Sequence, residues 1–181
     1  MSFLLIFITG AMTALSVSQD AELVDNPEYA GWKGKKVGAW VKHSVEADIA
    51  GVKIKSTRTL KLNAIARDKV VLEEVNVPEE KSKGESENFT RDVPARIKKG
   101  TNSEGDPTKE LARGKETLTI GNKKIECEWV EVEVESEDGT VKMKTWRSST
   151  VLGGEPRIVI KQEKGTKMTI SMNATDWKDG E

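Results

Sequence analysis

The sequence predicts an all-β fold, an antiparallel meander of about 8–10 strands curved strongly into a half-barrel or an open barrel. Two observations carry this prediction. Apolar and charged residues alternate with a period of two through most of the chain, while helical spacing is nearly absent. Consecutive segments also pair apolar with apolar and acid with base across short turns. A chain of 181 residues suits one domain with a sizeable core.

The first element is an apolar segment from Phe3 to Val17 that ends in small residues before Asp20. It is shorter than the roughly 20 apolar residues that span a bilayer. We therefore interpret residues 1–18 as a secretory signal peptide, with a retained N-terminal anchor or a buried element as alternatives. Cleavage would leave an exported chain, periplasmic or extracellular, without a membrane span.

A polar lead-in, residues 19–36, precedes a single β domain at 37–177. Its first hairpin turns at Ala50-Gly51, which places acids opposite lysines and apolar residues opposite apolar residues. A slip of one residue would destroy both matches. The expected partners are Ile49 with Val52, Ala47 with Ile54, Val41 with Leu60, Ala39 with Leu62, Asp48 with Lys53 and Glu46 with Lys55.

A third strand follows a turn at Arg67-Asp68. This register pairs Ala64 with Val71, Leu60 with Val75 and Arg58 with Val77. Residues 78–114 form a polar, irregular excursion within the domain. Its expected features are one strand through Phe89, Val93 and Ile97, an edge or bulge at Pro94, and a mobile loop at Gly100–Lys109.

The last strands show a change of apolar face. Gly121-Asn122 should pair Leu118 with Ile125 and Glu116 with Cys127. Apolar residues then shift from odd to even positions between Trp129 and Val130, which predicts a β-bulge or sharp bend there. Asp138-Gly139 should pair Glu135 with Lys142, Glu133 with Lys144 and Val134 with Met143. A Glu163–Gly165 loop should pair Ile160 with Met168 and Ile158 with Ile170, with Gly165 left-handed.

Composition excludes some classes of function. Lys and Arg total 29 against 30 for Asp and Glu, a near-neutral balance that argues against a general nucleic-acid binder. A single cysteine, Cys127, excludes an internal disulfide and suits a small buried side chain. No nucleophile motif, metal-ligand spacing or phosphate-binding loop is present. We therefore expect no cofactor, no metal and no catalytic residue.

The one histidine, His43, lies on the apolar face of its strand, opposite Arg58 and beside Ser56 in the expected register. It is interpreted either as a polar group near the open end of the sheet, reaching water, or as a polar anchor in a ligand cavity. The five tryptophans suit the core and its ends. If the cavity exists, Trp129 and Trp146 join His43, Arg58 and Ser56 as candidate ligand-binding residues.

Several short motifs resemble those of uncharacterised exported bacterial β-rich proteins: Val37–Val41, Gly114–Leu118, Cys127, Thr145–Ser148 and Gly153-Gly154. The order of elements is similar to the curved sheets of the LolA- and LolB-like lipoprotein-carrier superfamily. That resemblance implies a half-barrel that binds acyl chains on its concave face. The sequence departs from that pattern because it shows no clear helix to cover such a cavity.

The function expected from these features is a non-enzymatic envelope protein that binds a hydrophobic ligand or a protein partner on a concave apolar face. The alternative is a structural or interaction subunit of a surface assembly. An enzyme is the least favoured interpretation, since no acid–base or nucleophile pair can be identified.

Overall fold

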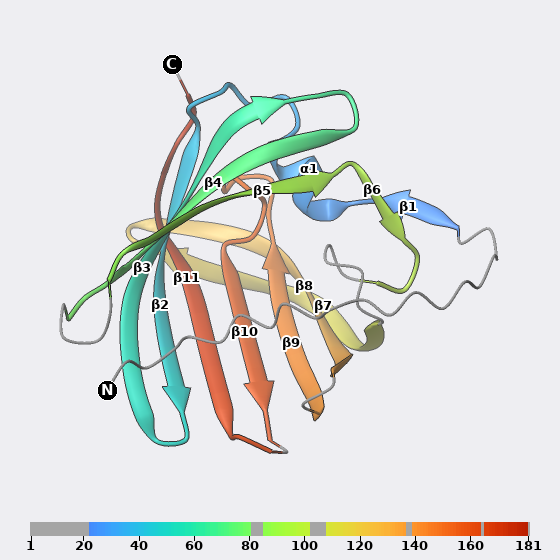
Figure 1. Cartoon of the computed structure of the whole chain (residues 1–181). Coiled ribbons are helices and arrows are strands. Elements are labelled where there is room, and N and C mark those ends of the chain that lie inside the picture. Colours follow the sequence, from blue (N-terminus) through green and yellow to red (C-terminus); the bar gives the residue numbers. More distant parts are fainter. Residues whose placement is uncertain (1–21, 81–84, 102–107, 137–138, 164, 181) are drawn as a thin grey trace.

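The computed structural model describes residues 22–80, 85–101, 108–136, 139–163 and 165–180. The expected signal peptide and most of the Gly100–Lys109 loop lie outside these residues. Antiparallel strands dominate the described part, which confirms the predicted fold class (Figure 1). Its elements are β1 (Leu23–Asp25), α1 (Pro27–Trp32), β2 (Trp40–Ile49), β3 (Val52–Ile65), β4 (Lys69–Pro78), β5 (Glu87–Pro94), β6 (Arg96–Lys98), β7 (Thr108–Ile120), β8 (Lys123–Ser136), β9 (Gly139–Arg147), β10 (Arg157–Gln162) and β11 (Met168–Lys178).

Nine of these strands form one curved sheet in the order β5-β4-β3-β2-β11-β10-β9-β8-β7. Two meanders, β2–β5 and β7–β11, are joined where β2 pairs with β11. The sheet is not closed, because β5 and β7 remain its two edges. A separate two-stranded sheet pairs β1 with β6, so Ile97 lies in β6 and does not continue β5.

The first hairpin matches its predicted register. Ile49 pairs with Val52, Ala47 with Ile54 and Val41 with Leu60. Ala50 and Gly51 both have positive φ, 52° and 86°, as a tight two-residue turn between twisted strands requires. The side chain of Asp48 accepts a hydrogen bond from the Gly51 amide at 3.0 Å.

The register of β3 with β4 was predicted correctly only next to the turn. Ala64 pairs with Val71, but a register shift between Leu62 and Ala64 leaves Asn63 as an extra residue. Beyond this bulge Leu60 pairs with Glu74 and not with Val75, and Arg58 pairs with Asn76 and not with Val77. The bulge therefore turns Glu74 toward the face that carries Leu60.

The bulge expected at Trp129–Val130 is wrong, because both residues keep a regular register with β7 and β9. The irregularity lies in β7, between Glu110 and Ala112. The change of apolar face has another cause. The β7–β8 hairpin extends past the end of β9 and crosses behind the sheet (Figure 1), where Lys123 Nζ lies 5.0 Å from the ring centre of Trp177 in β11.

Two later hairpins are offset by two residues from prediction. Glu133 pairs with Lys142 and not with Lys144, and Val134 with Val141 and not with Met143. Ile160 pairs with Ile170, and Ile158 with Met172. A shift of two residues keeps every side chain on its predicted face. The predicted faces are therefore correct, whereas the predicted pairing partners are wrong. Gly165 has a φ of 74°, the left-handed conformation predicted for it.

The range predicted as a polar lead-in contains the helix α1. Asn26 caps it by accepting a hydrogen bond from the Glu28 amide at 3.0 Å, and Pro27 occupies its first turn. The Asn26 side-chain amide donates to the Pro94 carbonyl at 2.8 Å, which fixes the helix to the end of β5. Tyr29 and Trp32 are buried beneath it.

The inner face of the sheet is the face that carries His43, and its upper part holds the core. Leu62, Leu72, Val41, Val70 and Val93 are fully buried there. Val151 and Leu152, from the connection between β9 and β10, are buried with them. We call α1 and this connection, residues 148–156, the cap.

Candidate functional site

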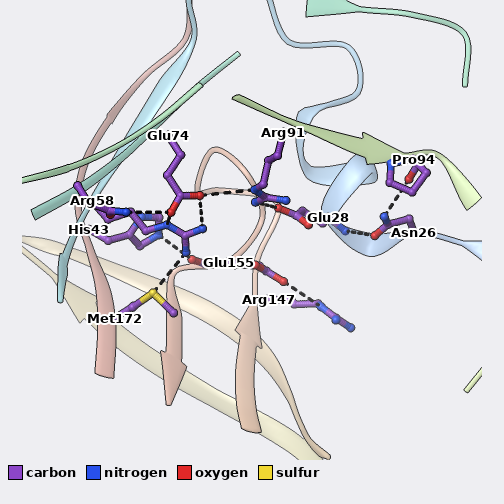
Figure 2. Close-up of polar contacts among 11 residues, drawn as sticks. Asn26, Glu28, His43, Arg58, Glu74, Arg91, Pro94, Arg147, Glu155 and Met172 are labelled. Atoms are coloured by element: carbon purple, nitrogen blue, oxygen red, sulfur yellow. Dashed lines mark hydrogen bonds and ion pairs between the residues drawn. The ribbon is translucent and has the colours of Figure 1, made fainter. Parts of the chain in front are cut away.

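A cluster of charged side chains lies between the sheet and the cap (Figure 2). Arg58 comes from β3, Glu74 from β4 and Arg91 from β5, while Glu28 comes from α1. We call these four residues the ion cluster. Glu74 is its centre and is only 3% exposed. Charges buried this deeply require close partners, so their geometry matters more than that of the ion pairs on the surface.

Glu74 receives two parallel hydrogen bonds from Arg58, Nε to Oε1 and Nη2 to Oε2, each 2.6 Å long. Arg91 Nε lies 3.5 Å from the same Oε2 and its Nη2 donates to Glu28. The chain of charges thus runs Arg58–Glu74–Arg91–Glu28 from the sheet into the cap. The fork from Arg58, together with the Asn76 amide that donates to Oε1 at 3.4 Å, satisfies most of the Glu74 lone pairs.

His43 and Glu155 connect a second part of the cap to the sheet. His43 Nε2 lies 3.2 Å from the Glu155 backbone carbonyl, which can only accept, so this nitrogen carries the proton. The Glu155 side chain, in turn, lies 4.0 Å from Arg147 Nε. Among the described residues, the buried side-chain nitrogens without a hydrogen-bond partner are His43 Nδ1, Trp32 Nε1, Arg91 Nε and Arg157 Nε.

Burial shifts the protonation of both groups. Burial lowers the pKa of His43 to about 4, although its hydrogen bond to the Glu155 backbone opposes the shift. Burial, reinforced by the nearby charge of Glu28, raises the pKa of Glu155 to about 7, while Arg147, Arg58 and Arg91 oppose this. At neutral pH the histidine is therefore uncharged, and Glu155 holds its proton more tightly than an exposed carboxyl does.

A small cavity of about 20 Å³ lies inside this site. Its lining is Glu28, Trp32, Val41, His43, Arg58, Leu60, Arg91, Leu152, Gly153, Glu155, Ile158 and Met172. A volume of this size holds about one water molecule. The enclosed part of the site is therefore too small for an acyl chain or a substrate.

The structure groups three of the five candidate residues from the sequence. His43 pairs with Arg58, as predicted, and Ser56 lies opposite Val45 on the same inner face. His43 is only 5% exposed, so the interpretation of it as a polar tip reaching water is wrong. Trp129 and Trp146 pair with each other on the outer face, away from His43.

Those two tryptophans hold cations on the outer face. Lys144 Nζ lies 3.7 Å from the ring centre of Trp129 and 4.6 Å from that of Trp146, and Arg157 lies 4.8 Å from Trp146. Trp146 Nε1 also donates to Glu116 at 2.8 Å. These contacts tie β7, β8, β9 and β10 together, so their clearest role is structural.

Sequence reasoning did not single out Glu28, Glu74, Arg91 or Glu155. Glu74 was hidden by the unrecognised bulge at Asn63, and Glu28 and Glu155 by their placement in the cap. One signal was available, because Arg58 fell on an apolar face where a buried cation needs an anion. That argument calls for a carboxylate but does not say which one.

The arrangement offers limited chemistry. Within the described ranges, no three His, Cys, Asp or Glu side chains are grouped to hold a metal ion. Cys127 is buried, as predicted, and burial raises the pKa of its thiol, which disfavours the nucleophilic thiolate. None of the described helices is both long and apolar enough to cross a membrane. The ion cluster is best described as the joint between sheet and cap.

Comparisons with known proteins give one similar solved structure. No protein-family model matches the chain, and no curated protein matches it. Among solved structures, the chain is similar to a protein of Bacteroides fragilis NCTC 9343 that is proposed to be exported and has a YmcC-like fold. The two are 10% identical with a TM-score of 0.44, over 80% of this chain and 97% of that one.

Proposed function

We propose that this protein is an exported, non-enzymatic binding protein that holds a hydrophobic ligand on its inner face. The observation that carries the proposal is a largely apolar surface on the lower part of that face. It crosses six strands in register, from β3 to β8. We call it the open apolar surface: Val45, Ala47, Ile54, Val130, Val132, Met143, Ile158, Ile160, Ile170 and Met172, all half-buried.

Two inner-face positions within this surface are polar: Ser56, opposite Val45, and the buried Thr145, opposite Ile158 and Val130. Along β11, Ile170 and Met172 point inward while the neighbouring Thr169 is exposed on the outer face. The one described helix, α1, packs on β4 and β5, which lie beyond the surface. Half-buried apolar side chains gathered on one face are typical of a binding site for an apolar partner, which supports the proposal.

The ligand would lie along the strands below the cluster. The enclosed cavity holds only about one water, so it does not compete as the ligand site. Contact with apolar side chains would remove area from water at about 25 cal/mol per Å². An elongated hydrocarbon matches a long curved sheet better than a compact ring does.

The alternative, a subunit that assembles through its sheet edges, has less support. The edge strand β5 ends in Pro94, which has no amide to donate. The other edge, β7, carries Lys109, Arg113 and Lys115 together with its register shift at Leu111. Charges, proline and irregular pairing are the features that block edge-to-edge association.

Export is part of the proposal and is supported by the apolar segment Phe3–Val17. N-terminal sequencing of the protein recovered outside the cytoplasm would test it. A new N-terminus near Ser18 supports a cleaved signal peptide, whereas recovery of the intact chain in the cytoplasm argues against it.

The binding proposal is tested with the protein purified after export. Native mass spectrometry should find a bound hydrophobic molecule, and the delipidated protein should bind a fluorescent fatty probe saturably. Ile170→Asp should abolish binding, and Thr169→Asp, the neighbouring outer-face position, should retain it. Circular dichroism would verify that both variants fold. Absence of any ligand and probe binding, or equal binding by the two variants, would overturn the proposal.

A further inference from the structure

Arg58 lies at the boundary between the ion cluster and the open apolar surface. On one side it meets Glu74, and on the other it meets Met172, which belongs to the apolar surface (Figure 2). The six steps along the strand from Arg58 down to Val52 cover about 20 Å. A ligand lying along the strands would therefore have one end at this guanidinium.

One donor nitrogen of Arg58, Nη1, has only a weak hydrogen-bond acceptor. Nε and Nη2 are both committed to Glu74 at 2.6 Å. Nη1 is directed at the Met172 sulfur, 3.4 Å away. A thioether is a weak acceptor for a charged donor. The side chain is 19% exposed and lies on the same inner face as the open apolar surface.

The local charge also favours an anion over a cation. Arg58, Arg91 and Arg147 stand against Glu74 and Glu28, with Glu155 the remaining acid near them. Burial holds the pKa of Glu155 near 7, so this acid gives up part of its charge at neutral pH. His43 is neutral there because burial lowers its pKa to about 4. Together, these arginines, glutamates and His43 can accommodate one further negative charge.

We propose that the ligand is a single-chain carboxylate, a fatty-acid anion, whose head accepts a hydrogen bond from Arg58 Nη1 while its chain lies on the open apolar surface. This inference rests on the proposed function and names the ligand class for the same site. A single available nitrogen, Arg58 Nη1, suits a ligand head group that carries one negative charge. A phosphate monoester would place nearly two charges beside Glu74, which already occupies the rest of the guanidinium.

The test compares four probes of equal chain length: dodecanoate, dodecanol, dodecyl phosphate and dodecyltrimethylammonium. Binding to the delipidated full-length protein is measured by calorimetry at pH 7. Dodecanoate should bind roughly tenfold or more tightly than dodecanol, the gain expected from a charge-assisted hydrogen bond. The trimethylammonium probe should bind more weakly than dodecanol.

Two variants assign the preference to Arg58. The double substitution Arg58→Gln and Glu74→Gln removes both charges together and should bring the dodecanoate-to-dodecanol ratio close to one. Met172→Leu, a change of similar volume, removes only the sulfur and should leave the preference equal or larger. The control pair Lys69→Gln and Asp92→Asn removes an exposed ion pair on β4 and β5, away from the open apolar surface, and should keep the wild-type ratio.

The outcomes separate the inference from the proposed function. If all four probes bind with similar affinity, or if the Arg58 and Glu74 double variant keeps the preference, this inference is wrong while the binding function stands. Tighter binding of dodecyl phosphate than of dodecanoate overturns the choice of a carboxylate. If no probe binds, both the function and the inference fail.

Discussion

Gly31 in α1 and Gly153 in the connection between β9 and β10 bring their backbones into direct contact. A methyl group on Gly31 would lie 2.3 Å from the Gly153 carbonyl oxygen, a distance that packed atoms cannot adopt. The ring of Trp32 lies against Gly153 as well, where a Cβ would meet it at 3.1 Å. The two halves of the cap therefore fit together because both positions lack a side chain.

The first prediction concerns this contact. Gly31→Ala should lower the free energy of unfolding by roughly 1–3 kcal/mol, because the backbone of residue 153 must move. Urea denaturation measures the loss. The exposed neighbour Ala30→Ser is the control and should change stability little. Equal stability of the two variants would show that the cap does not depend on the contact.

The second prediction concerns the pH dependence of stability. The pKa of Glu155 rises on folding from an ordinary value near 4.5 to about 7. The folded state therefore holds this proton more tightly, so the stabilisation is full below pH 4.5 and is lost as pH rises to 7. Glu155→Gln should remove that loss and be more stable than wild type at pH 8 by up to about 3 kcal/mol.

Urea unfolding at pH 5 and pH 8 measures this effect. The exposed Glu163→Gln serves as the control, since it changes the same charge outside the cap. If Glu155→Gln and Glu163→Gln show the same difference between the two pH values, burial of Glu155 has no energetic consequence.

The third prediction uses the single histidine of the chain. Because burial lowers the pKa of His43 to about 4, stability from the neutral ring is present above pH 6.5 and lost as pH falls toward 4. The ring protons should keep constant NMR shifts from pH 8 to about 5.5. The urea-unfolded chain is the internal reference and should titrate near 6.5. A folded-state midpoint near 6.5 would contradict burial of the ring.

The same site shows where sequence reasoning succeeds. The β2–β3 register could be predicted because acids, lysines and apolar residues all agree on it, and a slip of one residue would break every match. That register placed His43 opposite Arg58 correctly. Local charge and alternation are strong signals when a turn of two residues joins the strands.

The failures have equally physical causes. β4 carries apolar residues at both parities, including Val70, Val71 and Leu72, so its pattern does not reveal the extra residue at Asn63. The β8–β9 pair alternates Glu and Lys with a period of two, so a shift of two residues gives an equally good match. The cap could not be inferred, because its contacts join α1 to a connection more than 100 residues away.

The last prediction concerns the Arg58–Glu74 pair itself. Glu74→Gln should cost roughly 3–5 kcal/mol, because it leaves two half-buried arginines facing a buried neutral group. Replacing both partners, Arg58→Met with Glu74→Leu, should recover much of that loss, since the uncompensated charge of Arg58 disappears and Arg91 keeps Glu28. A double-mutant cycle in urea gives the coupling energy.

The exposed pair Lys69–Asp92, 2.6 Å apart on the neighbouring strands β4 and β5, provides the matched cycle. Its coupling should be within about 1 kcal/mol, because water screens both charges. The contrast between the two cycles is the decisive measurement. If the Arg58–Glu74 coupling is no larger than that of Lys69–Asp92, the ion cluster is not the joint that holds the cap to the sheet, and burial there does not strengthen the interaction.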